Sequence, residues 1–423
     1  MNHRRERLAR AEEALKLEDY AVMSGSTNTK LTKDICGYLG TSPADMDVTR
    51  FSDGEVTCMI NESIRGKDVF CVQSCAPPVN DSVVELLLTV TALRRSGANT
   101  ITAVIPYFGY KFHTKRGLPI STTYESRFLW NAAGDVAKML QVVGVDKIVS
   151  VDLQRPGQGH EACFFDSSVP VETISTEGLF VDYFSETLDF SRPVVIVSPS
   201  TEYVKKAKKF QKKLSKRAGP GKKVAFSAYV DTTPPDQPEA MLRKTSGTDD
   251  TAQLYGHSVK GASVVIIDDV VDTSGSLPLL TRRLKKEGAA KVYVCATHGV
   301  FTEKSMEVRV RPLSFLLLLL FLLFLLLFLL FLLHLFSHPL PSSSLPSAPQ
   351  IIDLMPVERV VVTDTLPLPS SCPSPKLVQL SVAALVARII EAEMRNNQGA
   401  FGLVADQGED HEDGEEETFE EEK

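Results

Sequence analysis

Two adjacent carboxylates, Asp268 and Asp269, follow directly on an apolar, β-branched run at 264–267. Such a run is typical of a buried parallel strand, which we expect to stop at the two acids. Small residues form a turn at 273–276, and the periodic stretch after it has Pro278 in its first turn, where a helix tolerates proline. Backbone N–H groups at a helix start bind anions, and carboxylates suit sugar hydroxyls or Mg²⁺. The pattern predicts a phosphate site beside an acidic pair; the alternative is an ordinary strand–helix turn with polar caps.

The elements that would position these groups are visible as further apolar runs. Buried strands are predicted at 147–153, 193–199, 224–230 and 291–298, and a turn with Asp-Gly chemistry between strands at 51–56. Helices are predicted at 31–39, 131–143, 204–217 and 375–393. The lysines of the helix at 204–217 are expected to line a solvated side; nucleic-acid binding is a sharper interpretation, but one lysine-rich face is weak evidence for it.

Composition limits the class of protein. The 423 residues are enough for two ordinary domains, and a hydrophobic fraction of 43% is adequate for sizeable cores. Seven scattered cysteines without metal-type spacing favour reduced thiols and a reducing compartment. The charged stretch at 1–20 lacks the pattern of a secretory signal. The tail at 408–423 holds ten acids and one lysine against a net charge of −7 for the chain, so the remainder is near neutral and bulk nucleic-acid binding is not expected.

Two longer stretches resemble one enzyme family. The segment 268–276 reads DDVVDTSGS, which is similar to the DDxxDTGGT signature of type I phosphoribosyltransferases and ribose-phosphate pyrophosphokinases, with serines at two loop positions. The run 51–110, from FSDGE through NESIRGKDVF to ITAVIPYFGY, is nearly continuous with the pyrophosphokinases, also called PRPP synthetases. The chain is therefore identified as a divergent member of that family over 20–397, interrupted at 308–350.

The resemblance implies a fold, a reaction and a set of site residues. The fold is α/β, with two phosphoribosyltransferase-like domains, each a parallel sheet flanked by helices. The reaction transfers the β,γ-diphosphate of ATP to ribose 5-phosphate, giving PRPP and AMP with Mg²⁺, and feeds nucleotide biosynthesis. Ribose 5-phosphate is assigned to Asp268, Asp269, Asp272, Thr273, Ser274, Gly275 and Ser276. ATP is assigned to Phe51, Asp53, Glu55, Lys115 and Arg116. The metal is assigned to Asp268 and Asp269, with His160 as a further candidate.

Several positions depart from the family pattern in the half that transfers phosphate. Phe112 replaces an arginine, and Thr114 replaces an aspartate. Gln154 replaces a histidine, Ser200 replaces a second aspartate, and Tyr229 replaces the catalytic lysine. Glu202 and Tyr203 replace glycines that let backbone approach phosphate. His160, in an insertion, could supply the missing imidazole, although a loop histidine is more often simply solvated. Losing the lysine would remove electrostatic stabilisation of the transition state.

Two functions from different classes follow. In the first, the chain is a divergent enzyme that makes PRPP. In the second, it is a non-catalytic, PRPP synthetase-associated type of subunit that regulates active partners in a homo- or hetero-oligomer. Both place it in the cytoplasm with ATP and ribose 5-phosphate as ligands, and neither involves nucleic acid. A membrane-anchored binding protein is a weaker third interpretation.

The expected organisation has one anomaly. A charged extension at 1–19 precedes an N-terminal pyrophosphokinase domain at 20–157; the phosphoribosyltransferase-like domain and its closing helix take 158–307 and 351–397, and a disordered acidic tail takes 408–423. Between them, 315–333 is nineteen consecutive Phe and Leu residues, long enough for a membrane helix. Phe, Leu, Ser and Pro, which dominate 313–349, are the residues of all-pyrimidine codons. We interpret 308–350 as a translated intron rather than a membrane anchor.

Overall fold

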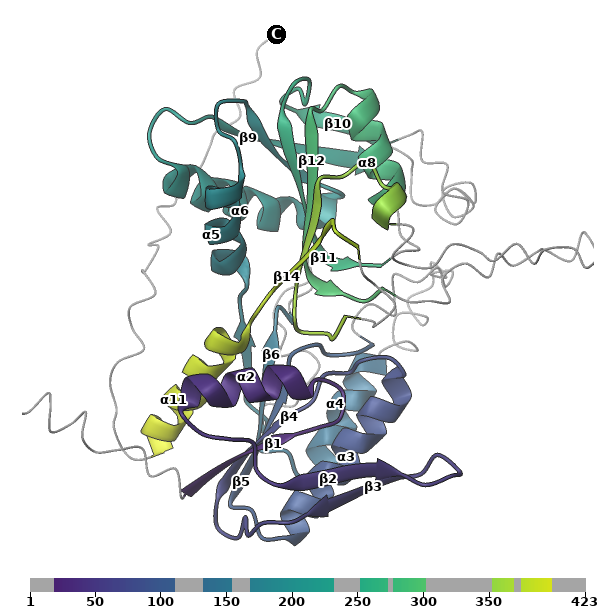
Figure 1. Ribbon diagram of the computed structural model, residues 1–423, viewed down its shortest axis with the longest axis vertical. Coiled ribbons are helices and arrows are strands. Elements are labelled where there is room, and N and C mark those ends of the chain that lie inside the picture. The colour runs from purple at the N-terminus through teal and green to yellow at the C-terminus, as the bar shows by residue number, and fades with distance from the viewer. Residues whose placement is uncertain are drawn as a thin grey trace, which may run out of the picture.

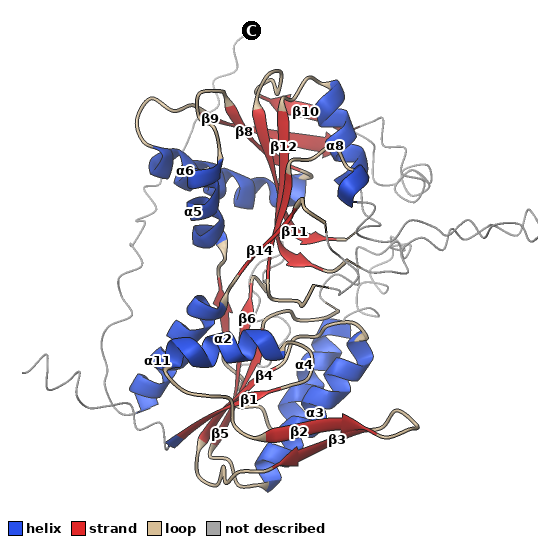
Figure 2. Ribbon diagram, in the orientation of Figure 1, coloured by secondary structure: helices blue, strands red, loops and turns tan. Residues whose placement is uncertain are grey.

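The computed structural model describes residues 19–110, 132–153, 168–231, 252–272, 277–301, 352–368 and 374–397. These residues form two large sheets, drawn one above the other in Figure 1, and a small two-stranded one; each large sheet carries helices on both faces. Figure 2 shows the same arrangement by element type, with the strands central and the helices outside. The α/β class with parallel sheets flanked by helices, expected from the resemblance, is confirmed.

The first sheet has five strands in the order β1-β4-β5-β6-β7, and every neighbouring pair is parallel. The strands are β1 Tyr20–Ser24, β4 Asp68–Val72, β5 Thr100–Ile105, β6 Lys147–Val151 and β7 Val171–Ile174. Side chains of a strand alternate between faces, so Ala21 and Met23 enter one core, whereas Tyr20 and Val22 enter another. Helices α3 (Val79–Arg95) and α4 (Ala132–Val142) cover the first of these faces.

The opposite face of the first sheet is covered by α2 (Thr29–Leu39) and by the last helix, α11 (Ala383–Asn397). The chain reaches α11 from β14 (Leu377–Leu380), which belongs to the second sheet. The prediction of one helix over 375–393 is therefore wrong in its first part. Residues 377–380 form an edge strand because they pair in parallel with β13 and satisfy its exposed backbone groups, a gain that a local helical pattern does not reveal.

The second sheet has seven strands in the order β10-β9-β8-β11-β12-β13-β14, and only β9 and β10 are antiparallel. The strands not yet bounded are β8 Val194–Ser198, β9 Val224–Asp231, β10 Ala252–Gly256, β11 Ser263–Val271, β12 Lys291–Gly299 and β13 Arg359–Thr363. Helices α5 (Glu177–Thr187) and α6 (Val204–Ala218) pack on one face, and α8 (Leu277–Lys286) packs on the other. A 3₁₀ turn, η5 (Thr201–Tyr203), leads from β8 into α6.

A separate antiparallel hairpin, β2 (Met46–Arg50) with β3 (Val56–Ile60), holds the predicted turn at 51–55. Gly54 has φ +94°, a backbone conformation that favours glycine in such a turn. In the described part of the chain, no helix has the length and apolar character to cross a membrane. The Phe/Leu run at 315–333, residues 1–18 of the predicted extension at 1–19 and the acidic tail all lie outside the described residues.

Candidate functional site

The acidic pair lies inside strand β11 rather than at its end. Pairing with β8 ends at Ile266, whereas pairing with β12 continues to Val271. The prediction that the strand stops at the acids is therefore wrong, because one neighbour carries the ladder past them. Asp268 and Asp269 consequently stand where β8 has turned away and the edge of β11 is open towards α6.

Asp268 meets the 3₁₀ turn that leads into α6. Tyr203, at the end of the 3₁₀ turn, is 6% exposed, and its hydroxyl forms a side-chain hydrogen bond with Asp268. Burial, together with the neighbouring charges of Asp268 and Asp269, raises the pKa of Tyr203, so the phenol stays protonated and donates. Glu202 is exposed, and Ser200 has an extended backbone whose carbonyl accepts a hydrogen bond from Ser198 Oγ at 2.6 Å.

Asp269 meets a lysine of the same helix. It is 1% exposed, and its Oδ1 accepts a charge-assisted hydrogen bond from Lys206 Nζ. Burial opposes the charge of Lys206, but Asp152 and Asp269 outweigh that effect and raise its pKa, so the side chain is an ammonium ion at neutral pH. The other oxygen of Asp269, Oδ2, is buried and has no hydrogen-bond partner among the described residues.

Asp152 brings the first sheet into the same site. It follows the end of β6 with φ +43°, a left-handed conformation that few residues other than glycine adopt. Its Oδ2 lies 3.8 Å from Lys206 Nζ and accepts hydrogen bonds from the hydroxyls of Thr176 and Thr297. The site thus collects a carboxylate from each sheet around one ammonium group.

Magnesium does not fit this arrangement as it stands. Within the described ranges, no three His, Cys, Asp or Glu side chains are grouped so that they could hold a metal ion. Mg²⁺ needs oxygen ligands in near-octahedral geometry, whereas Lys206 presents a positive charge between the two carboxylates that could provide them. His160 lies outside the described residues, as do Lys115, Arg116, Phe112, Thr114, Gln154 and the phosphate turn Thr273–Ser276.

Tyr229, at the position of the expected lysine, packs on the face of the second sheet that α8 covers, opposite the face covered by α6. It is 3% exposed in the core under α8, and its hydroxyl donates to Glu287 Oε2 at 3.1 Å. The guanidinium carbon of Arg283 lies 5.2 Å from the centre of the ring. Burial and the charge of Glu287 raise the pKa of Tyr229, so it cannot supply positive or negative charge at neutral pH.

The residues assigned to ATP lie elsewhere in the chain. Phe51, Asp53 and Glu55 are exposed in the hairpin turn, where Asp53 Oδ1 accepts from the backbone N–H of Glu55 at 3.0 Å. Phe51 is 59% exposed. In Figure 1 this turn projects sideways from the lower half of the molecule, whereas the second sheet, which carries Asp268 and Asp269, fills the upper half. Within one chain the two assigned groups are therefore not brought together.

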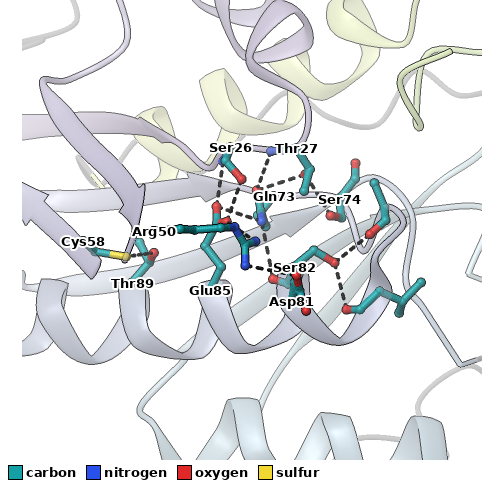
Figure 3. A network of polar contacts seen from close by, with 12 residues as sticks. Ser26, Thr27, Arg50, Cys58, Gln73, Ser74, Asp81, Ser82, Glu85 and Thr89 are labelled. Atoms are coloured by element: carbon teal, nitrogen blue, oxygen red, sulfur yellow. Dashed lines mark hydrogen bonds and ion pairs between the residues drawn. The ribbon is translucent and has the colours of Figure 1, made fainter. Parts of the chain in front are cut away.

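A polar network around the buried Glu85 connects the carboxyl ends of strands β1 and β4 in the first sheet and was not singled out from the sequence. Glu85, on α3, is 1% exposed and accepts from the Ser26 N–H at 2.7 Å, from Ser26 Oγ at 2.6 Å and from Gln73 Nε2 at 3.0 Å. Figure 3 shows these side chains converging above the helix, with Arg50 alongside. The available signal was a glutamate within the apolar stripe of a helix.

Contacts from the ends of β1 and β4 continue to the second sheet. Ser74 Oγ donates to the Thr365 carbonyl at 2.6 Å, and Asn28 Nδ2 donates to the Asp364 carbonyl at 2.7 Å. His298, fully buried on β12, contacts Thr365 through Nδ1 and meets the ring of Tyr107 edge-on. These contacts fix the loop after β13 against the first sheet, beside the strand β12 that also carries Thr297.

Comparison with known proteins gives consistent matches. A family model for the N-terminal domain of ribose phosphate pyrophosphokinase matches residues 20–144, and one for the phosphoribosyl transferase domain matches 176–309. The chain is 33% identical to a ribose-phosphate pyrophosphokinase of Campylobacter jejuni, over 69% of this chain and 83% of that protein. It is 32% identical to the Nostoc sp. protein of the same name, over 87% of this chain and 89% of that protein. A crystal structure of phosphoribosylpyrophosphate synthetase from Mycobacterium smegmatis matches with TM-score 0.64 and 26% identity, covering 89% of this chain and 99% of that one.

Proposed function

The chain belongs to the ribose-phosphate pyrophosphokinase family, and from that premise we propose that it is a subunit that binds ribose 5-phosphate and ATP but turns them over weakly or not at all when alone. The family reaction joins the two substrates to give PRPP and AMP. In this chain the acids assigned to the sugar are present, and the groups assigned to transfer of the diphosphate are replaced.

One observation supports this proposal above the others: the Tyr229 side chain is buried and hydrogen-bonded to Glu287. Transfer of a diphosphoryl group needs positive charge placed where negative charge develops, and such electrostatic stabilisation often contributes more to catalysis than any other effect. Tyr229 is neutral, buried and hydrogen-bonded to Glu287 on the α8 face. It would have to leave the core to reach a substrate, and it would bring no charge if it did.

The competing proposal is a divergent but active enzyme. Its candidate groups, Lys115, Arg116 and His160, lie outside the described residues. In either case Mg²⁺ would enter with the phosphates of ATP, because the described residues offer it no site of their own. We further propose that the chain assembles with itself or with other subunits of the family, acts in the cytoplasm, and divides into domains at 20–157 and at 158–307 with 351–397.

A single preparation tests the proposal. Purified protein lacking 308–350 is given ATP, Mg²⁺ and ribose 5-phosphate, and AMP release is followed. Calorimetry on the same preparation measures binding of ribose 5-phosphate to the protein and to an Asp268→Ala, Asp269→Ala double variant. We expect binding that the double variant weakens strongly, with AMP release near background. Robust AMP release would favour the active enzyme, and equal affinity in the double variant would refute the sugar site.

A further inference from the structure

Lys206 lies on the buried stripe of a helix that is otherwise strongly basic on its exposed side. Tyr203, Ala207, Phe210 and Leu214 follow one another at helical spacing and are each at most 6% exposed. Lys206 falls within that stripe, because positions three and four residues apart share a helix face. Its side chain is 28% exposed, against 64% for Lys209 one turn later. Lys206 is therefore directed toward the sheets, whereas Lys209 is directed toward solvent.

The ammonium group of Lys206 has the surroundings of a bound cation. Asp269 Oδ1 accepts its hydrogen bond, and Asp152 Oδ2 lies 3.8 Å away on the opposite side of the domain boundary. Two largely buried carboxylates repel each other unless positive charge lies between them, and removing that charge is strongly unfavourable. We propose that Lys206 is the internal cation of this site: it takes the position between Asp152 and Asp269 that a divalent ion would otherwise occupy, and it thereby excludes Mg²⁺.

One carboxylate oxygen of Asp269 has no hydrogen-bond partner among the described residues and could act as a metal ligand. Asp269 Oδ2 is buried without a hydrogen-bond partner in the described part of the chain, so the acid retains an open ligand position. If Lys206 lost its charge, the Asp152 carboxylate and Asp269 Oδ1 would face one vacated space, and Asp269 would keep its second oxygen unpaired beside it. Oxygen atoms in such an arrangement are the ligands that hard divalent cations select. A neutral side chain at 206 should therefore convert a lysine-filled site into a metal-binding one.

The test uses substrate-free protein, so it is independent of the proposed function. Protein lacking 308–350, its Lys206→Met variant and the matched control Lys213→Met are titrated with MgCl₂, with NaCl at equal ionic strength as reference, and the unfolding midpoint is recorded. Lys213 is on the same helix and pairs with Glu177 at 2.9 Å, but its side chain is 43% exposed. We expect Mg²⁺ to stabilise Lys206→Met alone; at one hundred times the dissociation constant, its folding equilibrium should rise about a hundredfold.

Two results would overturn the inference. One is a folded Lys206→Met protein that gains no stability from Mg²⁺. The other is a Mg²⁺ response of the unaltered chain that Asp269→Asn abolishes, because that would place a metal at the acids despite the lysine. If Lys206→Met folds only when Mg²⁺ is present, the requirement itself supports the inference. If it does not fold at all, the comparison of the unaltered chain with Asp269→Asn decides: equal Mg²⁺ responses support an internal cation, and unequal responses refute it.

Discussion

Replacing Tyr203 by phenylalanine should lower the stability of the folded protein and, at the same time, raise its affinity for ribose 5-phosphate. The substitution removes only the hydroxyl that hydrogen-bonds Asp268 and keeps the ring in its buried place. If ribose hydroxyls bind Asp268, as we propose, and do so at the oxygen that this phenol contacts, they must first displace the phenol. The bond then stabilises the free protein and opposes the ligand by the same amount, so its removal acts on the two equilibria with opposite sign.

The size of the effect follows from the chemistry of the pair. A hydrogen bond to a charged group contributes about 1.5–3 kcal/mol, and Asp268 is half-buried, so we take the lower end, about 1.5 kcal/mol. Since about 1.4 kcal/mol corresponds to a factor of ten, ribose 5-phosphate should bind Tyr203→Phe about tenfold more tightly. Urea denaturation should show a loss of stability of similar magnitude.

Tyr20→Phe is the matched control. The Tyr20 hydroxyl is also buried and donates to the Met394 carbonyl at 2.6 Å, but it lies on the first sheet, against α11. This variant should lose about 0.5–1.5 kcal/mol of stability with no change in affinity. The reasoning is refuted if Tyr203→Phe loses stability while its affinity is unchanged, because the sugar and the phenol would then not compete for Asp268. Absence of binding to every variant would instead count against the proposed function.

Two further predictions concern catalysis and the first sheet, and a third concerns the transcript. Tyr229→Lys alone should not raise AMP release above that of the parent protein, because Ser200 and Gln154 still stand where the resemblance to the family leads us to expect an aspartate and a histidine; a large gain would show that the lysine alone was missing. Glu85→Ala should cost about 1–3 kcal/mol in urea denaturation, since it removes the main acceptor of the buried Gln73 amide and the acceptor of the more exposed Ser26, whereas the exposed Glu186→Ala on α5 should change stability by less than about 0.5 kcal/mol. Sequencing of cDNA across codons 300–360 should show the Phe/Leu tract removed, and a dominant transcript that keeps it, with the protein in the membrane fraction, would contradict the intron interpretation.

Much of the fold was predictable because its strands are short, buried and β-branched. The runs at 193–199 and 291–298 coincide with β8 and β12, and the Asp-Gly turn at 51–56 does join two antiparallel strands. Errors arose where pairing overrode local pattern. Strand β11 passes through the acids because β12 continues beside it, and 377–380 is a strand because β13 offers a partner. Neither neighbour is visible from the segment itself.

The contents of the acidic site were less accessible to sequence reasoning. The lysines of α6 were all expected on a solvated side, and that prediction is wrong for Lys206. A lysine side chain is amphipathic, so its methylene groups can lie within the apolar stripe of a helix. Whether its ammonium group then forms a buried ion pair depends only on its distance from Asp152 and Asp269. Those acids belong to different sheets, and no spacing along the chain encodes how the two sheets approach each other.

The ends of the anomalous segment constrain what it can be. Phe301 and Ile352 are the nearest described residues on either side of 302–351, and both are 1% exposed members of one buried cluster. Strands β12 and β13, which precede and follow the segment, are paired in parallel within one sheet. One passage of 315–333 through a bilayer would leave these two ends on opposite sides, which the shared core forbids. Exposure of nineteen large apolar side chains to water would cost tens of kcal/mol at about 1.5–3 kcal/mol each, against a net stability of about 5–15 kcal/mol. Joining Glu307 to Ile351 avoids both costs, because it removes the apolar run and leaves a short connection between the two buried ends.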